Sequence, residues 1–330
     1  MKILVVRFSS IGDIVLTTPI VRCIKQQLPH AEIHFLTKTG FRSILSENPY
    51  VDQLITIQKS IDEVLAQLKL EKYDFLVDLH NNVRTRSLKL KLRVPNATFP
   101  KLHLEKWLLV HFKKQMKNQV HIVDRYFKAV EKLNIKNDHL PCDFFIAPSE
   151  VIDLTTVGLE AKRYITFAIG AQFFTKRMPV SKMVEIVRQL KQPVVLLGGE
   201  MDIETGEALR NALADQQIFN FCGKYSLQQS ASFVQQSAVL LTHDTGLMHI
   251  ASAFEVPTVS VWGNTVPALG MYPYFPQSPS NFSIHERLEV NCRPCSKIGF
   301  QQCPQKHFKC MHLQDASEIA TDVNQKGLQN

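Results

Sequence analysis

The feature that most constrains the fold is a repeated alternation between short apolar runs and segments of helical length. In the first half of the chain, apolar runs of strand length lie at residues 2–8, 33–37, 54–57 and 75–79. The alternation restarts near Tyr164, with further runs at residues 164–169, 194–197, 218–221, 239–242 and 258–262. Strands that alternate with helices indicate βαβ units, so we predict an α/β fold with two parallel sheets covered by helices.

The intervening segments fit helices. We expect one helix from the loop at residues 9–13 to Leu28, because residues 17, 21, 24 and 28 repeat at helical spacing before Pro29 ends the pattern. A second helix is expected at residues 61–70. Residues 102–133 are predicted to be mainly helical, either as an insertion or as a helical face of the first domain.

The length of 330 residues supports two domains at roughly 150 residues each. We place the domains at residues 1–153 and 154–312, with residues 313–330 as a C-terminal helix or tail that packs back on the first domain. In open parallel sheets, ligands bind at the carboxyl ends of the strands. We therefore expect a central cleft faced by the loops of both domains.

Positive charge is concentrated in one region. Residues 84–128 hold twelve Lys and Arg residues against two acidic residues, whereas the whole chain has a net charge of +8. Such a region favours a polyanionic partner, such as a phosphorylated glycan, a nucleic acid or an anionic membrane face. A solvated, lysine-rich helix face is the alternative interpretation.

No run of apolar residues approaches the ~18 of a membrane span, and Arg7 interrupts the apolar start. We therefore expect a cytoplasmic protein in a reducing compartment, where the seven cysteines are thiols or metal ligands.

The loop at residues 9–13 follows the first strand. It has neither the glycine pattern of a dinucleotide-binding loop nor the Gly-Lys-Ser/Thr of a P-loop. Its last residue, Asp13, has two open interpretations. It could be a helix N-cap, or it could accept a proton from a substrate hydroxyl at the mouth of a cleft.

Three loops of the second half suggest a nucleotide-diphosphate site. Residues 242–249 follow a strand and begin a helix, whose free amides could bind an anion. Lys176 and Arg177 could neutralise phosphate, and Glu200, after two glycines that permit close approach, could accept a hydrogen bond from a ribose. In the alternative interpretation, Asp244 only caps the helix and His249 only packs.

These segments, in this order, resemble glycosyltransferase family 9, the ADP-heptose:lipopolysaccharide heptosyltransferases. The resemblance rests on residues 1–13, 175–179, 197–200 and 244–249 and covers nearly the whole chain. One departure is Met178, where many relatives have an aromatic residue. The resemblance implies a GT-B fold, with an acceptor-binding N-terminal domain, a nucleotide-sugar-binding C-terminal domain and inverting, metal-independent transfer.

The resemblance also implies roles for individual residues. Asp13 matches the proposed general base. The donor-binding residues are expected to be Lys176, Arg177, Glu200, Asp244, Thr245, Gly246, Leu247 and His249. For acceptor binding we assign Arg7, Ser10 and Gly12, which flank Asp13, together with His80, Asn81, Arg84 and Arg86 after the strand at residues 75–79.

The expected partners are an ADP-sugar donor, a phosphorylated or acidic lipid-linked glycan acceptor and an anionic membrane contacted peripherally, with no nucleic acid. Two alternatives stay open. One is a nucleotide-sugar epimerase of the same architecture, and the other is a non-catalytic nucleotide- or polyanion-binding protein.

A cluster of four cysteines lies near the C-terminus, at Cys292, Cys295, Cys303 and Cys310. Thiolates in a tight loop can bind Zn²⁺ tetrahedrally, and a full set of four ligands would leave no position open for catalysis. A structural zinc site and a cluster of reduced, partly buried thiols are the two interpretations. No cofactor is expected for catalysis.

Overall fold

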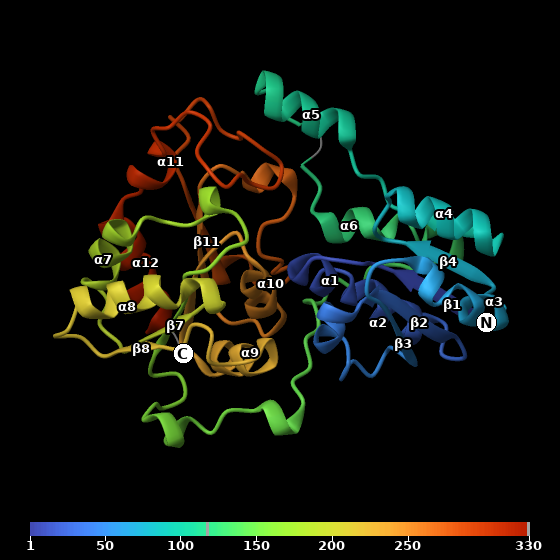
Figure 1. The fold of residues 1–330 in the computed structure, drawn as a ribbon, viewed down its shortest axis with the longest axis horizontal. Helices are drawn as coiled ribbons and strands as arrows, with labels where there is room; N and C mark the ends of the chain where they lie inside the picture. The colour runs from blue at the N-terminus through green and yellow to red at the C-terminus, as the bar shows by residue number, and fades with distance from the viewer. Residues whose placement is uncertain (117–118, 329–330) are drawn as a thin grey trace. The chain divides into compact units, whose positions relative to one another are not determined.

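The computed structural model describes residues 1–116 and 119–328, which form two compact units (Figure 1). One unit comprises Met1–Leu102 and Val120–Phe145, and the other comprises His103–Gln119 and Ile146–Asn330. The division differs from the predicted boundary after residue 153 in two ways. It falls at residue 146, and a segment from the middle of the basic region belongs to the second unit.

The first unit contains a five-stranded sheet in the order β3-β2-β1-β4-β5, in which all neighbouring strands are parallel. The strands are β1 (Lys2–Val6), β2 (Glu32–Lys38), β3 (Gln53–Ile57), β4 (Phe75–Asp78) and β5 (Asn96–Thr98). The helices are α1 (Ile11–Val15), α2 (Thr18–Gln27), α3 (Leu65–Leu70), α4 (Val83–Leu92) and α6 (Ile122–Phe127), with short 3₁₀ turns η1 (Thr39–Ile44), η2 (Ile61–Glu63) and η3 (Glu131–Leu133).

The first helical segment differs from the prediction of one continuous helix. It is divided into α1 and α2, because Pro19 has no N–H to donate to a preceding turn and therefore lies in the first turn of α2. The hydroxyls of Thr17 and Thr18 donate to the carbonyls of Ile14 and Val15 at the junction. This break makes α1 a single short turn that ends the loop carrying Asp13.

The second unit contains a six-stranded sheet in the order β11-β10-β9-β6-β7-β8, again with parallel neighbours throughout. The strands are β6 (Ile165–Ala168), β7 (Val194–Leu197), β8 (Ile218–Asn220), β9 (Val239–His243), β10 (Thr258–Trp262) and β11 (Phe282–Glu286).

The helices of the second unit are α5 (His103–Phe112), α7 (Val180–Val187), α8 (Ile203–Ala212), α9 (Leu227–Gln236), α10 (Gly246–Ala253), α11 (Lys309–His312) and α12 (Ala316–Gly327). The 3₁₀ turns are η4 (Pro148–Glu150), η5 (Leu154–Val157), η6 (Phe174–Lys176), η7 (Glu200–Asp202), η8 (Pro267–Leu269) and η9 (Pro279–Asn281).

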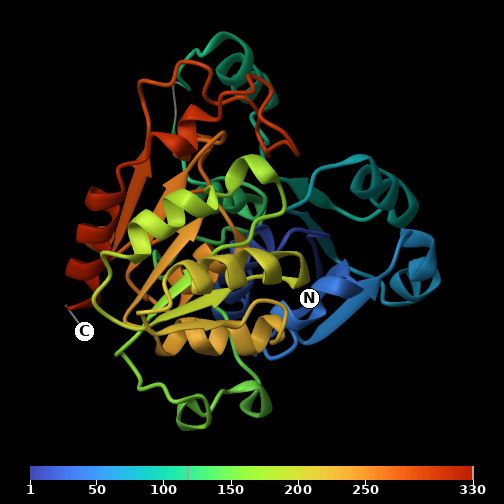
Figure 2. The same cartoon turned by 60° about the vertical axis from the view of Figure 1, so that its left-hand side comes forward.

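Both faces of the second sheet are covered. One face carries an apolar core with residues of α7, α8 and α12, and the other carries a core with residues of α9 and α10. The C-terminal helix α12 lies beside α7 (Figures 1 and 2). It buries Ile319, Ala320 and Val323 in the core of its own unit. The expected tail on the first domain is therefore an integral helix of the second.

In each sheet the strand order reverses beside the first strand of the unit, between β1 and β4 and between β6 and β9. In open α/β sheets, the crevice at such a switch point lies outside the carboxyl ends of the strands and is where ligands bind. The fold thus directs attention to the loops after β1, β4, β6 and β9.

Candidate functional site

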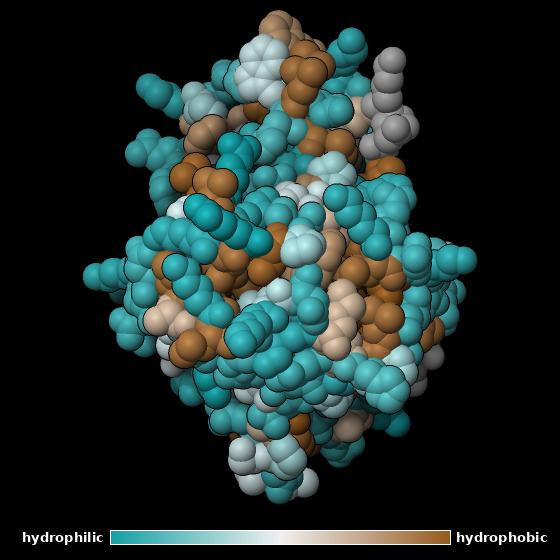
Figure 3. Space-filling view, turned by 90° about the vertical axis from the view of Figure 1, so that its right-hand side faces the viewer, coloured by the Kyte–Doolittle hydropathy of each residue, from teal (hydrophilic) through white to brown (hydrophobic). Residues whose placement is uncertain are grey.

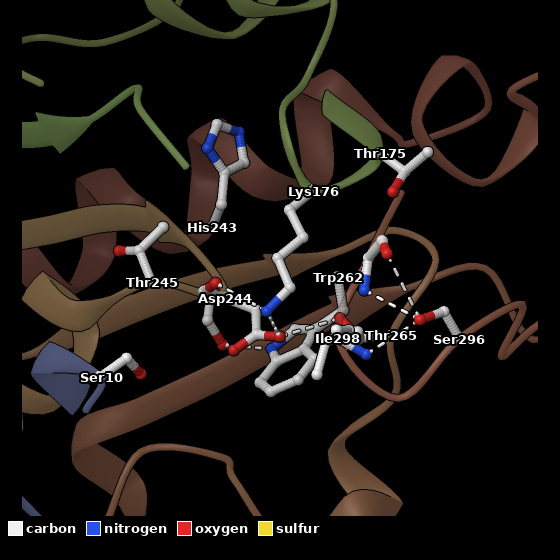
Figure 4. Close-up of polar contacts among 12 residues, drawn as sticks. Ser10, Thr175, Lys176, His243, Asp244, Thr245, Trp262, Thr265, Ser296 and Ile298 are labelled. Atoms are coloured by element: carbon white, nitrogen blue, oxygen red, sulfur yellow. Dashed lines mark hydrogen bonds and ion pairs between the residues drawn. The ribbon is translucent and has the colours of Figure 1, made fainter. Parts of the chain in front are cut away.

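The switch point of the second unit brings Lys176 and Asp244 together (Figure 4). Lys176 ends η6 in the loop after β6, and Asp244 directly follows β9. The Lys176 ammonium lies 2.6 Å from Asp244 Oδ2, and the hydroxyl of Thr265 donates to the same oxygen at 2.9 Å. Two residues that are far apart in sequence therefore form one polar cluster, which Thr265 from the loop after β10 completes.

The helix α10 starts next to this cluster. Its N-cap is Thr245, so the alternative in which Asp244 caps the helix is wrong. Among the described residues, no side chain caps the amides of the first turn, and the Thr245 hydroxyl lies 3.2 Å from that of Thr242 instead. These amides and the helix dipole provide a site suited to an anion beside the Lys176 ammonium. His249 is buried within α10, which favours its packing interpretation.

Arg177 lies in the same loop but has a different partner. Its Nη1 lies 3.0 Å from Asp202 Oδ1, and its Nε donates to the carbonyl of Ala171. Asp202 Oδ2 also accepts from the amide of Gly199 at 2.9 Å. Lys176 is therefore the residue that meets Asp244, whereas Arg177 holds the loop after β6 against the turn after β7.

Gly198, which lies two residues before Glu200, and Gly170, which follows β6, are required for a structural reason that the sequence did not reveal. A Cβ on Gly198 or Gly170 would lie 2.7 Å or 2.2 Å from atoms of the Asp202 side chain. Gly170 and Gly198 therefore make room for this carboxylate, whereas the sequence predicts that Gly198 permits close approach of a ligand. Glu200 itself is exposed in η7, at the carboxyl end of β7.

His243, the last residue of β9, was not predicted as a site residue. It is fully buried, and its Nε2 accepts from the amide of Met178 at 3.1 Å. Burial, with the positive charge of Arg177, lowers the pKa of His243 to about 3. A neutral imidazole therefore ties the segment after Lys176 to the strand that carries Asp244.

The switch point of the first unit holds Asp13. Asp13 lies in the first turn of α1, where its Oδ2 accepts from the amide and the hydroxyl of Ser10. The N-cap is Ser10, so Asp13 is not the N-cap that one interpretation expected, although it does accept from the backbone of the cap residue. Its other oxygen, Oδ1, lies 2.6 Å from Arg7 Nη2.

Arg7 is held on several sides. Its Nε donates to the carbonyl of Ser9 at 2.7 Å and its Nη1 to that of Leu79 at 2.6 Å. The guanidinium also lies 5.9 Å from the ring centroid of Tyr126. Burial opposes the charge of Arg7, yet the neighbouring carboxylate of Asp13 raises the pKa of Arg7 above its ordinary value. The acceptor-binding role of Arg7 stays a prediction, and the structure shows its guanidinium paired with the carboxylate of Asp13.

His80 follows β4 on the same edge of the sheet, and its ring lies edge-on to Phe8. Burial and the charge of Arg7 lower the pKa of His80 to about 4. Its Nδ1 is buried and meets no hydrogen-bonding atom among the residues that the structure describes.

The other candidates for acceptor binding differ in exposure: two are held within the fold and three are exposed to solvent. Asn81 is structural, because its amide donates to Asp78 and its side chain to the carbonyl of Phe99. Gly12 is buried within α1. Ser10, Arg84 and Arg86 are exposed, the last two on α4. A polyanion could therefore contact the two arginines without any rearrangement.

The four cysteines do not converge on one point. Among the described residues, the one group of at least three His, Cys, Asp or Glu side chains with ligand atoms within 4.8 Å of one another is Glu32, His34 and Glu71. The Lys2 ammonium lies 2.6 Å from Glu71 and 3.2 Å from Glu32, so a cation already occupies that group. Burial raises the pKa of Cys295 to about 12 and that of Cys310 to about 11.

The segment at residues 292–310, which holds the four cysteines and which we call the cysteine loop, supports the polar cluster of Lys176, Asp244 and Thr265. Arg293 is buried and donates to the carbonyls of Gly263, Trp262 and Thr265. Phe300 donates from its amide to the hydroxyl of Thr175, the residue before Lys176. The loop thus fixes the two segments that carry Thr265 and Lys176, a role that its cysteine spacing did not indicate.

No helix within residues 1–116 and 119–328 is both long enough and apolar enough to cross a membrane.

Two open parallel sheets, each with polar residues in the loops at its switch point, are suited to bind ligands at these loops. Residues 62–328 match the family model of glycosyltransferase family 9 (heptosyltransferase). The chain therefore belongs to this family, and its enzyme class is that of a glycosyltransferase.

Known proteins agree with the assignment. Lipooligosaccharide heptosyltransferase 2 of Haemophilus ducreyi is 25% identical over 295 residues, which cover 81% of this chain and 85% of the relative. A glycosyltransferase family 9 structure from Veillonella parvula superposes with a TM-score of 0.80 at 22% identity, covering 100% and 98% of the two chains. The structure of E. coli ADP-heptose LPS heptosyltransferase II gives a TM-score of 0.75 at 22% identity, with 100% and 99% covered. The predicted GT-B fold is confirmed.

Proposed function

We propose that the enzyme transfers a heptose from an ADP-sugar to a lipopolysaccharide-core or similar lipid-linked glycan. The names of the relatives support this donor and this class of acceptor. The observation that carries the proposal is the cluster of Lys176, Asp244 and Thr265 beside the N-terminus of α10. A cation and free helix amides at a switch point suit a diphosphate.

In the proposed donor complex, the Lys176 ammonium turns from Asp244 to the diphosphate, and the amides after Thr245 bind phosphate oxygens. Glu200, at the end of β7, accepts from the ribose. Arg177 contributes positive charge without contacting the diphosphate directly, because Asp202 and the carbonyl of Ala171 already bind its guanidinium. Leu247 and His249 belong to the helix that presents these amides.

The proposed reaction is a direct displacement. The carboxylate of Asp13 takes the proton of the acceptor hydroxyl while that oxygen forms a bond to the anomeric carbon. The bond from that carbon to the diphosphate breaks on the opposite face, and its electron pair leaves with ADP. The configuration is therefore inverted. Lys176 and the α10 amides stabilise the charge that develops on phosphate, and one such interaction is often worth ~3 kcal/mol.

We propose that this reaction needs no metal, since the lysine and the helix amides supply the positive charge. Activity should then persist in a chelator. A chelator-sensitive initial rate, restored by added Mg²⁺ or Mn²⁺, would contradict this part of the proposal.

A structural zinc at Cys292, Cys295, Cys303 and Cys310 remains a separate proposal. The thiol donor set suits zinc; three of the four side chains are half-buried, and two of these, Cys292 and Cys303, pack against the core that contains Cys310. Metal analysis of the purified protein, with Cys292→Ser as the matched variant, tests it. One equivalent of zinc that the variant loses is the expected result.

The acceptor is proposed to meet the unit that contains Asp13, with Arg84 and Arg86 contacting its phosphate or acidic groups. Contact with an anionic membrane would keep the enzyme near such a lipid-linked substrate.

A donor panel tests the proposed function most directly. ADP-heptose should raise the melting temperature more than UDP-, GDP- or CMP-sugars at equal concentration, because a ligand stabilises the state that binds it. Formation of a heptosylated acceptor, measured by mass spectrometry, should require both substrates. Conversion of the donor with no acceptor present would favour the epimerase alternative, and preference for a uridine donor would contradict the proposed donor.

A further inference from the structure

The helix α5 presents large apolar side chains to solvent. Leu104 is 65% exposed, Trp107 is 45% exposed and Phe112 is 66% exposed, whereas Leu109 is buried. The spacing of residues 104, 107 and 112 places them on one broad side of a helix with 3.6 residues per turn. An amphipathic surface helix ordinarily turns its apolar side to the core, whereas α5 buries Leu109 and in addition turns a second apolar side to solvent. Figure 3 shows hydrophobic side chains exposed at the upper end of the molecule, where α5 lies in Figure 1.

The exposed side chains form an ordered patch. The Trp107 ring stacks on His111 with centroids 5.0 Å apart and meets Phe112 edge-on at 5.3 Å. In addition, the Nδ1 atom of His111 lies 3.0 Å from the carbonyl oxygen of Trp107. We call Leu104, Trp107, His111 and Phe112 the α5 patch. It is a preformed aromatic surface on a helix of ten residues.

Positive charge surrounds the patch. Lys101 and Lys106 lie before and within α5, and Lys113 and Lys114 follow it, against the single acidic residue Glu105. The Lys113 ammonium donates to the carbonyls of Val110, Cys292 and Pro294. It therefore ties the end of α5 to the cysteine loop, so the helix is held in place within its unit.

We propose that the α5 patch is a membrane-interface anchor that inserts its aromatic side chains among the headgroups of an anionic phospholipid leaflet. Aromatic and apolar residues on one side of a helix, flanked by lysines, are what such an interface binds, and each lysine adds attraction to the anionic lipid. The proposal rests on the proposed lipid-linked acceptor. It assigns the membrane contact to one helix and adds apolar insertion to the electrostatic attraction.

The two tryptophans of the chain provide a direct test. Trp262 is buried at 1% exposure, so Trp107 is the tryptophan that a membrane would reach. We expect vesicles that contain phosphatidylglycerol to shift the fluorescence of the protein to shorter wavelength and to protect it from aqueous quenchers. Vesicles of phosphatidylcholine alone should give a much smaller shift. In Trp107→Phe the shift should vanish while vesicle binding persists, since Phe also inserts.

A matched pair of triple variants separates the patch from general hydrophobicity. Leu104→Ser, Trp107→Ser and Phe112→Ser together should weaken sedimentation with the anionic vesicles about 100-fold, because three large apolar side chains no longer leave water. The matched triple variant changes Leu70, Met201 and Leu288 to Ser, which are exposed apolar residues on other elements. It should bind vesicles as the wild type does. Equal losses in both triple variants, or no loss in the first, would overturn the proposal.

Two further measurements keep the outcome clear. A fluorescence shift that grows with protein concentration in the absence of lipid would show that a second copy covers the patch, and this too would overturn the proposal. Donor binding by thermal shift and transfer to a short soluble acceptor should be unchanged in the Leu104, Trp107 and Phe112 variant. If the wild-type protein binds vesicles but transfers no heptose, the proposed function is wrong, whereas the proposal that the α5 patch binds the membrane is supported.

Discussion

The two switch points each hold an ion pair between a carboxylate and a cation at 2.6 Å, yet the cations are held very differently. Arg7 binds Asp13, two backbone carbonyls and the face of an aromatic ring. Among the residues that the structure describes, the acceptors of the Lys176 ammonium all belong to Asp244. The first pair is a fixed support for its carboxylate, and the second holds a cation that can turn to a ligand.

The difference follows from the chemistry of the two cations. A guanidinium has five donors in a rigid fork and can bind several acceptors at once, whereas an ammonium is a compact charge on a flexible stem. A general base must keep one orientation, and a phosphate ligand must exchange one anion for another. Each switch point also has a histidine whose pKa is lowered by burial, the half-buried His80 in the first and the fully buried His243 in the second.

The largest expected effect is at Asp13. Asp13→Asn keeps an oxygen for the backbone of Ser10 but cannot take a proton, so kcat should fall about 10²- to 10⁴-fold while ADP binding stays unchanged. Steady-state kinetics and calorimetry measure the two quantities. Asp153→Asn, which changes the carboxylate that caps the 3₁₀ turn η5, is the control. A loss below about fivefold would remove Asp13 as the base.

Next is Lys176→Met, which should lower kcat/KM about 10²- to 10³-fold and weaken ADP binding. Arg177→Met should have a much smaller effect on ADP binding, because Arg177 is occupied by Asp202. The control is Lys25→Met, which removes an ion pair with Asp52 in the other unit. If the Arg177 variant loses more affinity than the Lys176 variant, the exchangeable cation has been assigned to the wrong residue.

Arg7→Lys tests the fixed pair. A lysine keeps the charge but cannot donate to Asp13, Ser9 and Leu79 together, so kcat should fall about tenfold with little change in the KM for the donor. Arg22→Lys is matched, since Arg22 is buried and pairs with Asp138 and Asp143 in the same unit. It should lower the melting temperature without this loss of kcat. Equal kinetic effects of the two variants would make Arg7 merely structural.

Thr265→Val should weaken ADP binding about fivefold, which is the usual worth of one hydrogen bond of about 1 kcal/mol. The lost bond is the one from Thr265 to Asp244, which orients the carboxylate toward Lys176. Calorimetry measures the change. Thr155→Val, which loses a similar bond to Asp153, should leave ADP binding unaltered.

The last prediction concerns the pH dependence of stability and His243, which lies outside the direct contacts of the ligand. Its pKa of about 3 lies below the ordinary 6.5 of an unfolded chain, so the unfolded state binds more protons between these values. This contribution to stability is complete above about pH 6.5 and falls by about 1.4 kcal/mol per pH unit below it.

The measurement is urea unfolding at pH 7.5 and pH 5.5, with Trp107→Phe leaving Trp262 as the probe of the second unit. Wild-type His243 should make this unit about 1.4 kcal/mol less stable at the lower pH. His243→Gln keeps an acceptor for the Met178 amide and should remove that difference. The same pH dependence in both proteins would contradict a neutral histidine.

Much of the molecule follows from local pattern. Strands of four to five buried residues could be predicted from the sequence. Both faces of a parallel sheet are covered, so each such strand is a nearly continuous apolar run. The edge strands β5 and β11 were missed. Their residues are only half-buried and include Asn96, Thr98, His285 and Glu286. The resemblance located Asp13, Lys176 and Asp244, but neither pattern nor resemblance indicated Thr265, Asp202 or His243.

The sequence by itself determined the two α/β arrays, the positions of most strands and the loops in which polar residues gather, because hydrophobic period and turn residues act over a few positions. Only the tertiary structure decided which partner each polar group has: Asp13 with Arg7, Asp244 with Lys176 and Thr265, and Arg177 with Asp202. It also decided that α5 turns its aromatic side outward. Strand order and packing bring residues together across as many as 181 positions, as Lys113 and Pro294 show, and no local sequence pattern can indicate such contacts.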